Sequence, residues 1–512
     1  MATLSDPPRE SFHISQLLYD TRYRSITIQV IAFILIVAAF VFLARNVVIN
    51  LSALGKDFDF GFLGSRAGYD INQRLIEYSN ESTHGRAALV GILNTLLVAF
   101  LGCIVATILG VIAGVLRLSK NWIVSRLMSV YVEGFRNIPL LLWIIVIFAV
   151  MTESTPSPRD FRGADPDASM LLGESVAITN RGIFIPAPVW GDGAFLLVSV
   201  FIVSLAGIWA FRRFARNRQE ATGAILPVFW VSLGLFFVPV LVVYFAYSAA
   251  ISRDQYPLLA VGAEQGMTLE SFVEANGNPS ICALPSTAGV NLSSALREIG
   301  QRANIVRVST EAELLEAVQS GDCILAAVSP TVAASFPGTV EGVEMAALTD
   351  TVDRGRPLQF ERPQLAGFNF EGGVQLRNSL IALWFALSLY TGAFIAEIVR
   401  AGILSVSRGQ TEAAFALGLR PNRTMNLVIL PQALRVIIPP LISQYLNLTK
   451  NSSLAIAVGY MDVRATLGGI TINQTGRELE GILLMGLFYL ALSLLISAVM
   501  NLYNNSVKLQ ER

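Results

Sequence analysis

Two pairs of charged residues interrupt otherwise apolar stretches and are the first candidates for chemistry. Glu133 and Arg136 lie in YVEGFRNIPLL. Glu397 and Arg400 lie in FIAEIVRAG. Charges within a membrane segment are costly, and members of an i, i+3 pair share a helix face on which they can neutralise each other. The pairs predict either structural ties at the cytoplasmic mouth of a bundle or groups that contact a zwitterionic solute or control its exit.

Further polar residues lie in two other apolar stretches, and Lys450 is the most informative of them. An ammonium group deep in an apolar run needs a partner. A solute carboxylate is one such partner, and backbone carbonyls of a helix broken at Pro439–Pro440 are another. Residues of this set are candidates for a substrate pathway or gate: Asn94, Thr95, Gln444, Asn447, Lys450 and Ser452.

The sequence favours neither catalysis nor metal binding. His13 and His84 lie in polar segments far from a promising nucleophile, and the three cysteines form no C-x-x-C pair. No G-x-x-x-x-G-K-[ST] pattern occurs, so any nucleotide must be hydrolysed by another protein. A formal net charge of +0 argues against a general nucleic-acid binder. We therefore expect no enzyme activity, no metal and no cofactor bound by this chain.

Composition indicates several membrane spans, because 53% of the residues are hydrophobic and only 14% are charged. The first apolar run, Ile26–Leu43, follows Arg22 and Arg24, which is typical of a retained span with a cytoplasmic N-terminus. Hydropathy predicts about eight spans, near 26–48, 87–116, 127–151, 194–212, 225–251, 374–400, 424–459 and 480–503.

Basic residues gather on one side of these spans, in Arg117–Arg126, in Arg212–Arg218 and in the loop that contains Arg408 and Arg420. By the positive-inside rule this side is cytoplasmic, and so are both termini.

The stretch SRGQTEAAFALGLRP, Ser407–Pro421, predicts a short helix in that cytoplasmic loop. Ser407 and Gln410 have capping-box spacing, and Gly418 with Pro421 predicts the stop. Its small residues permit close approach to another protein, and Glu412 can pair with a cation. The stretch is therefore either a docking helix or an ordinary loop helix. The residues expected to contact a partner are Thr411, Glu412, Ala413, Ala414 and Gly418.

EAA followed by glycine (EAAFALG) in a cytoplasmic loop resembles the coupling motif of ABC importer permeases. AFIAEIVRAGILSV before it and LPQALRVIIPPLISQYLNLTKNSSLAIAVGY after it resemble the polar amino acid permease family. The length resembles the long general or acidic/amide amino acid permeases of Gram-negative bacteria. This resemblance spans most of the chain, except much of 253–356.

The resemblance implies the transmembrane subunit of an ATP-driven importer for glutamate, glutamine, aspartate and asparagine, or for L-amino acids broadly. It implies a bacterial inner-membrane location and a lipid bilayer around the chain. The implied partners are a cytoplasmic ABC ATPase dimer that holds ATP and Mg²⁺, a periplasmic amino-acid-binding protein and a second homologous permease. A non-identical permease is expected, and a homodimer stays open.

We therefore expect an all-α polytopic membrane protein with a small α/β periplasmic insert. The resemblance implies a five-helix importer core, made by the spans near 87–116, 127–151, 374–400, 424–459 and 480–503. The expected parts are 1–86, 87–252, 253–357 and 358–512, the last with the coupling loop 405–421. A ligand-gated channel with an extracytoplasmic binding lobe is the alternative, and a non-transporting assembly subunit is a third reading.

Strand and helix patterns alternate through the insert, and Thr310 with Glu313 has capping-box spacing. The segment Ser280–Ser329 resembles one lobe of periplasmic amino-acid-binding proteins, in which the loop Ser286–Ala288 would receive a carboxylate. A docking or scaffold role and ligand binding both remain open. Cys282 and Cys323 fall on predicted neighbouring strands in an oxidising compartment, so we expect a disulfide between them and a free Cys103. The alternating stretches are Ser280–Leu284, Asn291–Gln301, Asn304–Val308, Thr310–Gln319 and Cys323–Ser329.

Overall fold

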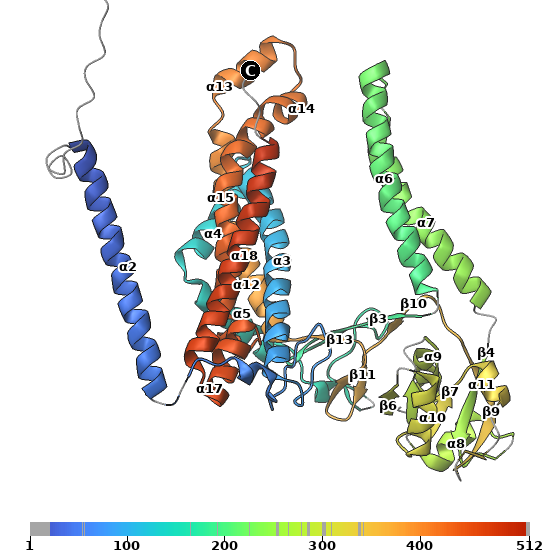
Figure 1. The fold of residues 1–512 in the computed structure, drawn as a ribbon. Coiled ribbons are helices and arrows are strands. Elements are labelled where there is room, and N and C mark those ends of the chain that lie inside the picture. The colour runs from blue at the N-terminus through green and yellow to red at the C-terminus, as the bar shows by residue number, and fades with distance from the viewer. Residues whose placement is uncertain are drawn as a thin grey trace, which may run out of the picture. The chain divides into compact units, whose positions relative to one another are not determined.

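The structure is a computed structural model that forms two compact units (Figure 1). One unit contains Met1–Phe148 with Ser379–Arg512, and the other contains Ala149–Asn378. The described residues are 21–507, apart from 54, 56, 164, 192, 225, 252–254, 265, 278, 284–286, 300–303, 309, 336–338 and 341–342.

Within the described ranges, eight helical segments are long and apolar enough to cross a membrane, which confirms the predicted polytopic fold. Six of them are single helices: α2 (Thr21–Ala53), α3 (His84–Leu116), α6 (Ala194–Thr222), α7 (Val228–Ile251), α12 (Asn378–Leu404) and α18 (Glu478–Val507). The other two are the composite segments Leu140–Phe161 and Pro421–Val458.

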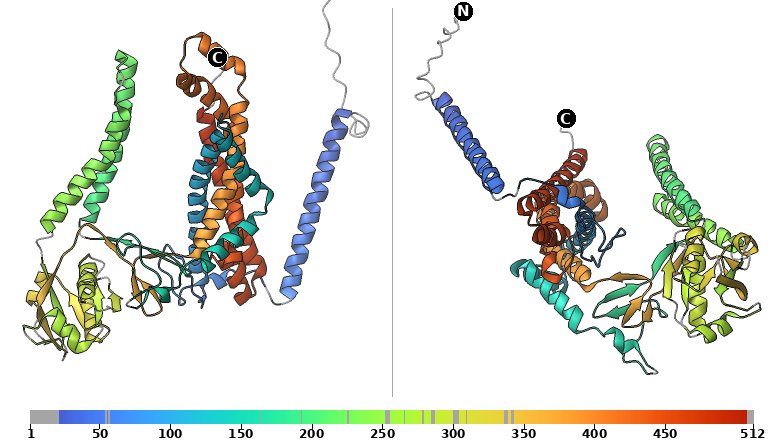
Figure 2. Two further views of the ribbon diagram at one scale, coloured as in Figure 1. Left: turned by 180° about the vertical axis from the view of Figure 1, so that it is seen from behind. Right: turned by 60° about the horizontal axis from the view of Figure 1, so that its bottom comes forward.

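Helices α3 and α12 contact each other closely, and Figure 2 shows both in one bundle with α15 and α18. A Cβ added at Gly110 of α3 would lie 2.5 Å from the Cβ of Ile395, and one at Gly114 would lie 2.6 Å from the carbonyl oxygen of Ala396. Small residues at such positions let two membrane helices approach closely and gain van der Waals contact.

The span predicted at 127–151 is wrong as a single helix, because it contains two helices. Helix α4 (Trp122–Asn137) ends before Pro139, and α5 (Leu140–Glu153) begins after it. Ile138 is extended, with φ −105° and ψ 135°. A proline disfavours helical backbone in the residue before it. The helix break expected at Pro139 is confirmed.

The other predicted break, at Pro439–Pro440, is wrong. Helix α15 (Leu430–Asn451) continues through both prolines. The irregular turns lie at its ends, in the π-helical segment Met425–Ile429 (η3) and the 3₁₀ segment Ser452–Val458 (η4). Prolines are tolerated in membrane helices where neighbouring groups satisfy the carbonyls that they free.

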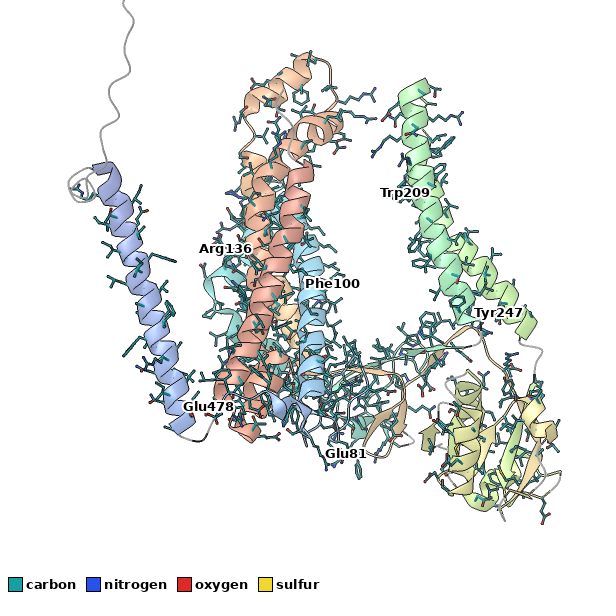
Figure 3. All side chains as sticks on the ribbon, viewed as in Figure 1. Glu81, Phe100, Arg136, Trp209, Tyr247 and Glu478 are labelled. Atoms are coloured by element: carbon teal, nitrogen blue, oxygen red, sulfur yellow. A yellow bond between two sulfur atoms is a disulfide. The ribbon has the colours of Figure 1, made fainter. Side chains whose placement is uncertain are left out.

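Short elements close the end of the bundle opposite α13 (Arg408–Ala416), where Figure 3 labels Glu81 and Glu478. His84 Nδ1 lies 3.0 Å from Thr471 Oγ1, which ties α3 to these elements. They are η1 (Gly61–Gly64), α16 (Val463–Ala465), η5 (Thr466–Thr471) and α17 (Ile472–Thr475).

The second unit contains the α6–α7 hairpin, a group of short strands and an α/β domain. The short strands form sheets in the orders β1-β2-β13, β10-β3 and β11-β12. Phe370 packs against Phe161 and Phe184, with ring centroids 5.2 and 5.1 Å apart. The strands are β1 (Ala177–Thr179), β2 (Gly182–Ile185), β3 (Ala187–Trp190), β10 (Leu358–Glu361), β11 (Gln364–Ala366), β12 (Asn369–Glu371) and β13 (Val374–Leu376), and η2 (Pro158–Phe161) precedes them.

The α/β domain confirms the predicted insert. Its six-stranded sheet has the order β6-β5-β7-β4-β9-β8, with β5 parallel to β6 and β7. Its core includes Leu258, Phe272, Ile281 and Leu292, all 0% exposed. The elements are β4 (Gln255–Val261), α8 (Leu269–Asn276), β5 (Ser280–Ala283), α9 (Thr287–Glu298), β6 (Asn304–Arg307), α10 (Glu311–Gln319), β7 (Leu325–Ala327), α11 (Pro330–Ser335), β8 (Thr339–Val340) and β9 (Val343–Asp353).

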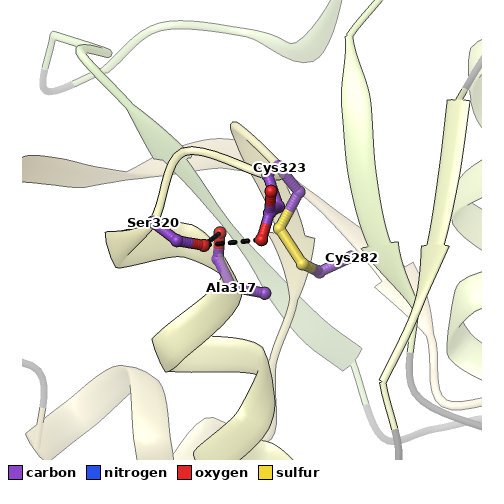
Figure 4. The surroundings of a disulfide bond; sticks show 5 residues. Cys282, Ala317, Ser320 and Cys323 are labelled. Carbon is purple, nitrogen blue, oxygen red and sulfur yellow. Dashed lines mark hydrogen bonds between the residues drawn. A yellow bond between two sulfur atoms is a disulfide. The ribbon is translucent and has the colours of Figure 1, made fainter.

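Two local features of this domain follow from its sequence. The side chain of Thr310 accepts a hydrogen bond from the backbone N–H of Glu313 at 3.2 Å, so Thr310 caps α10 as predicted. A disulfide joins Cys282 of β5 to Cys323, which precedes the neighbouring strand β7 (Figure 4). Cys103 is a free thiol. Helix α9 begins at Thr287, four residues before the predicted start at Asn291.

Candidate functional site

The four charges singled out in the sequence converge on one cluster, which Arg117 completes. Glu397 accepts a short hydrogen bond from Arg117 Nη1. It also pairs with Arg136 at 4.0 Å and with Arg400 at 3.8 Å. The second carboxylate, Glu133, lies 3.7 Å from Arg117. Ends of α3, α4 and α12 are therefore joined by ion pairs.

Local pairing was expected within each i, i+3 pair, and the structure shows a different arrangement. Glu397 and Arg400 do pair along α12, but Glu133 and Arg136 each reach across to another helix. Arg136, labelled in Figure 3, also lies over the ring of Phe394, 5.4 Å from its centroid. These charges therefore tie α3, α4 and α12 together.

Asn94 and Thr95 are fully buried, and their side chains bind backbone groups. The Nδ2 group of Asn94 donates to the carbonyls of Gln73 and Met461, at 2.7 and 2.9 Å. The Oγ1 atom of Thr95 accepts from the backbone N–H of Val463 at 3.1 Å. Both side chains thus fasten the segment after η4 to α3.

The polar residues of α15 and of the start of η4 differ in exposure. Ser452 is buried and donates to the Thr449 carbonyl at 2.7 Å. Gln444 is half-buried, whereas Asn447 and Lys450 are exposed. In the part of the chain that the structure describes, the Lys450 side chain has no ion-pair or hydrogen-bond partner, so it does not bind the backbone carbonyls that were one of its two possible partners. Lys450 is available to a solute, to water or to another subunit.

Sequence reasoning missed Asp462, although an acid in the apolar run GYMDVRATL was the available signal. Asp462 is 0% exposed, and its Oδ1 accepts from the backbone N–H of Ala465 at 2.8 Å. Burial raises the pKa of its carboxyl from 3.8 to about 6, and hydrogen bonds from Ala465 and the charge of Arg464 oppose this only in part.

We expect wild-type protein to be more stable at pH 5 than at pH 7.5. A carboxyl whose pKa is raised on folding favours the folded state below its unfolded pKa of about 4, and this contribution is lost as the pH rises through about 6. Asp462→Asn should remove about 1 kcal/mol of the difference between these two pH values, because about one pKa unit of the shift lies above pH 5. Thermal unfolding of both proteins at the two pH values measures it, and an unchanged pH difference in the variant would contradict it.

Helix α13 packs against its own chain through a small buried residue. Ala414 is only 3% exposed, so it positions the helix, while Glu412 and Ala413 are exposed and Thr411 is half-buried. Ser407 stands at the N-cap but makes no side-chain capping bond, so the expected capping box is absent. The expected stop is present, because Gly418 has φ +76°.

A Schellman motif ends this helix, and two apolar side chains near that end are exposed. Gly418 N donates to the Phe415 carbonyl at 2.9 Å, and Leu419 N donates to the Ala414 carbonyl at 3.1 Å. Phe415 is 49% exposed and Leu417 is 83% exposed. Sequence reasoning did not single out these two residues, and they offer a partner an apolar contact beside Glu412.

The expected ligand loop of the insert is only partly visible. Ser286 lies outside the described residues, and Thr287 begins α9, with Ala288 buried beneath it. Among the described residues, no group of three or more histidine, cysteine, aspartate or glutamate residues is placed to hold a metal ion.

Comparisons with known proteins identify relatives along the whole chain. The family described as "binding-protein-dependent transport system inner membrane component" matches residues 365–509. The chain is 45% identical, over 100% of both proteins, to the glutamate/glutamine/aspartate/asparagine transport system permease protein BztB of Rhodobacter capsulatus. It is 35% identical to the general L-amino acid transport system permease protein AapQ of Rhizobium johnstonii, over 97% of this chain and 95% of that one. It is also 35% identical to the putative amino-acid ABC transporter permease protein YhdX of Escherichia coli, over 94% of each.

Proposed function

The chain belongs to the permease family of amino-acid ABC transporters, and on that premise we propose that it imports polar amino acids in an ATP-driven complex. It is a multi-pass inner-membrane permease subunit. The substrates proposed are glutamate, glutamine, aspartate and asparagine. The single observation that carries this is the 45% identity, over the full length of both chains, to a relative named for these four amino acids. The relative named for general L-amino acids makes a broader set the second candidate.

Energy in this proposal comes from a cytoplasmic ABC ATPase dimer, which holds ATP and Mg²⁺. Exposed Glu412 on α13, with Phe415 and Leu417 beside it, supports docking of that ATPase at the helix. A periplasmic amino-acid-binding protein delivers the substrate, and a second, non-identical permease completes the membrane pathway. Exposed Lys450 is a candidate group of that pathway.

The orientation proposed places α13 and both termini in the cytoplasm. Eight spans among the described residues return the chain to the side on which it began. Basic residues at the end of α6, such as Arg213 and Arg216, lie on the same predicted side as Arg408 near α13.

Glu412→Lys tests the coupling assignment. The reversed charge should weaken ATPase binding by roughly 1–3 kcal/mol, which is about a 5- to 150-fold loss of affinity. ATP-driven uptake should fall with it while the purified chain keeps its thermal stability, because Glu412 is exposed and has no partner among the described residues. Copurification of the ATPase and uptake in proteoliposomes measure both effects.

Glu220→Lys is the matched control, since it makes the same charge change at an exposed site near the end of α6. Gly418→Trp should also uncouple ATP hydrolysis from uptake. Only glycine adopts φ +76° without strain, so the turn that ends α13 should be distorted. The space around Gly418 is open, so an added Cβ meets no atom of this chain. Normal uptake and normal ATPase affinity in Glu412→Lys would refute the coupling role of α13.

A further inference from the structure

A cavity of about 480 Å³ lies within the second unit. Most of the residues that line it lie outside the membrane spans. Its walls come from α9 and β10, both labelled in Figure 1, from Tyr244 of α7, and from Glu174 in the turn before β1. Cavities of roughly 300–1,000 Å³ are typical of small-molecule sites. The cavity is formed along the side of α9, at Ser293 and Ser294.

The lining carries two positive side chains, Arg356 and Arg362, and two negative ones, Glu174 and Glu361. Arg362 Nη1 donates to the Gly173 carbonyl at 3.2 Å, and Glu361 also has an interaction partner. Arg356 and Glu174 are exposed at the cavity, and neither side chain has a partner among the described residues. A ligand that pairs with both presents an anionic and a cationic group.

Gln359 offers a further unused group. Its Nε2 donates to Oδ1 of Asn291, whereas its Oε1 is buried and accepts no hydrogen bond from the described residues. A buried acceptor without a donor is costly, and an ammonium group brings donors. Gln359 is one of the residues that line the cavity.

The turn that carries Glu174 is held in an uncommon conformation. Glu174 has φ +59° and Leu172 has φ +55°, values that are rare for residues other than glycine. Such local strain gathers at ligand sites, where the surrounding structure maintains it. Here the strained turn holds the Glu174 carboxylate in the lining of the cavity, which also contains the oppositely charged Arg356.

From these observations we propose that the cavity binds a free zwitterionic α-amino acid, with its carboxylate toward Arg356 and its ammonium group toward Glu174 and Gln359. A dicarboxylate would satisfy Arg356 but would meet the charges of Glu174 and Glu361. The inference deepens the proposed function, on which the choice of amino acids as the ligand class rests. It gives the second unit a binding site of its own, separate from the transmembrane pathway.

The test is equilibrium binding to the full chain in lipid nanodiscs, without ATPase or binding protein, with L-glutamine as the zwitterion and glutarate as the dianion. Three variants address the site: Arg356→Gln and Glu174→Gln each remove one charge, and Ser294→Trp fills the cavity from an exposed position on α9. Arg159→Gln is the matched control, an exposed arginine of the same unit outside the lining.

We expect one saturable glutamine site per chain, weakened at least tenfold by all three variants and less than twofold by the control, with glutarate at least tenfold weaker. Absent binding, binding that the three variants leave within twofold, or glutarate binding as tight as glutamine would overturn the proposal. The readout needs no ATP, so its failure leaves the coupling test at Glu412 unaffected.

Discussion

Replacing both Cys282 and Cys323 by alanine is expected to cost the α/β domain about 4 kcal/mol of folding free energy. The disulfide closes a loop with a sequence separation of 41 residues. In the chain-entropy account, closing a loop of this length restricts the unfolded chain by about 4 kcal/mol. Both positions are buried in the sheet core, at 1% and 0% exposure, so lost packing adds to the effect.

Pulse proteolysis of the full chain without reductant measures this loss. Cys103→Ala is the control, because Cys103 is a free thiol in α3 and should leave the domain unchanged. Treating the wild type with reductant should reproduce the double variant. Equal protease resistance of wild type and double variant would show that the disulfide does not stabilise the domain.

Glu397→Gln is expected to destabilise the membrane bundle by about 2–3 kcal/mol, because it leaves the buried Arg117 with only the 3.7 Å pair to the more exposed Glu133. Glu397 is the carboxylate shared by Arg117, Arg136 and Arg400, and the Arg117 side chain is only 10% exposed. Glutamine keeps the size of the side chain, so the loss of stability measures the effect of removing the negative charge.

Glu133→Gln is the matched comparison in the same cluster. The Glu133 side chain is 54% exposed and pairs at 3.7 Å with Arg117, so its loss should cost less than about 1 kcal/mol. Thermal unfolding in nanodiscs ranks the two variants. A larger loss for Glu133→Gln than for Glu397→Gln would contradict the assignment of Glu397 as the centre of the cluster.

The sequence predicted those features of the fold that depend on a residue and its immediate neighbours. Pro139 ends α4, Thr310 caps α10, and Gly418 ends α13, because each effect depends on a residue and its immediate neighbours. Hydropathy predicted the spans for the same reason. Pro439 and Pro440 misled the prediction, since the continuity of a helix past proline depends on what surrounds it.

The candidate sites depend on residues that are far apart in sequence. Arg117 and Glu397 are separated by 280 residues, so i, i+3 spacing could identify the charges but not their partners. Burial of Asp462 depends on the packing of α3 against the segment after η4, as the bond from Val463 to Thr95 shows. The cavity depends on Glu174 and Arg356 lying in the same lining, which their spacing in the sequence does not reveal.

Uptake of labelled glutamate or glutamine into proteoliposomes tests the central claim most directly. The vesicles contain this chain, the permease and ATPase subunits that copurify with it, and the binding protein. Uptake should require hydrolysable ATP, cease with a non-hydrolysable analogue, and fall at least fivefold in Glu412→Lys while Glu220→Lys transports normally. Amino acid flux that continues without ATP would contradict the account and favour a ligand-gated channel.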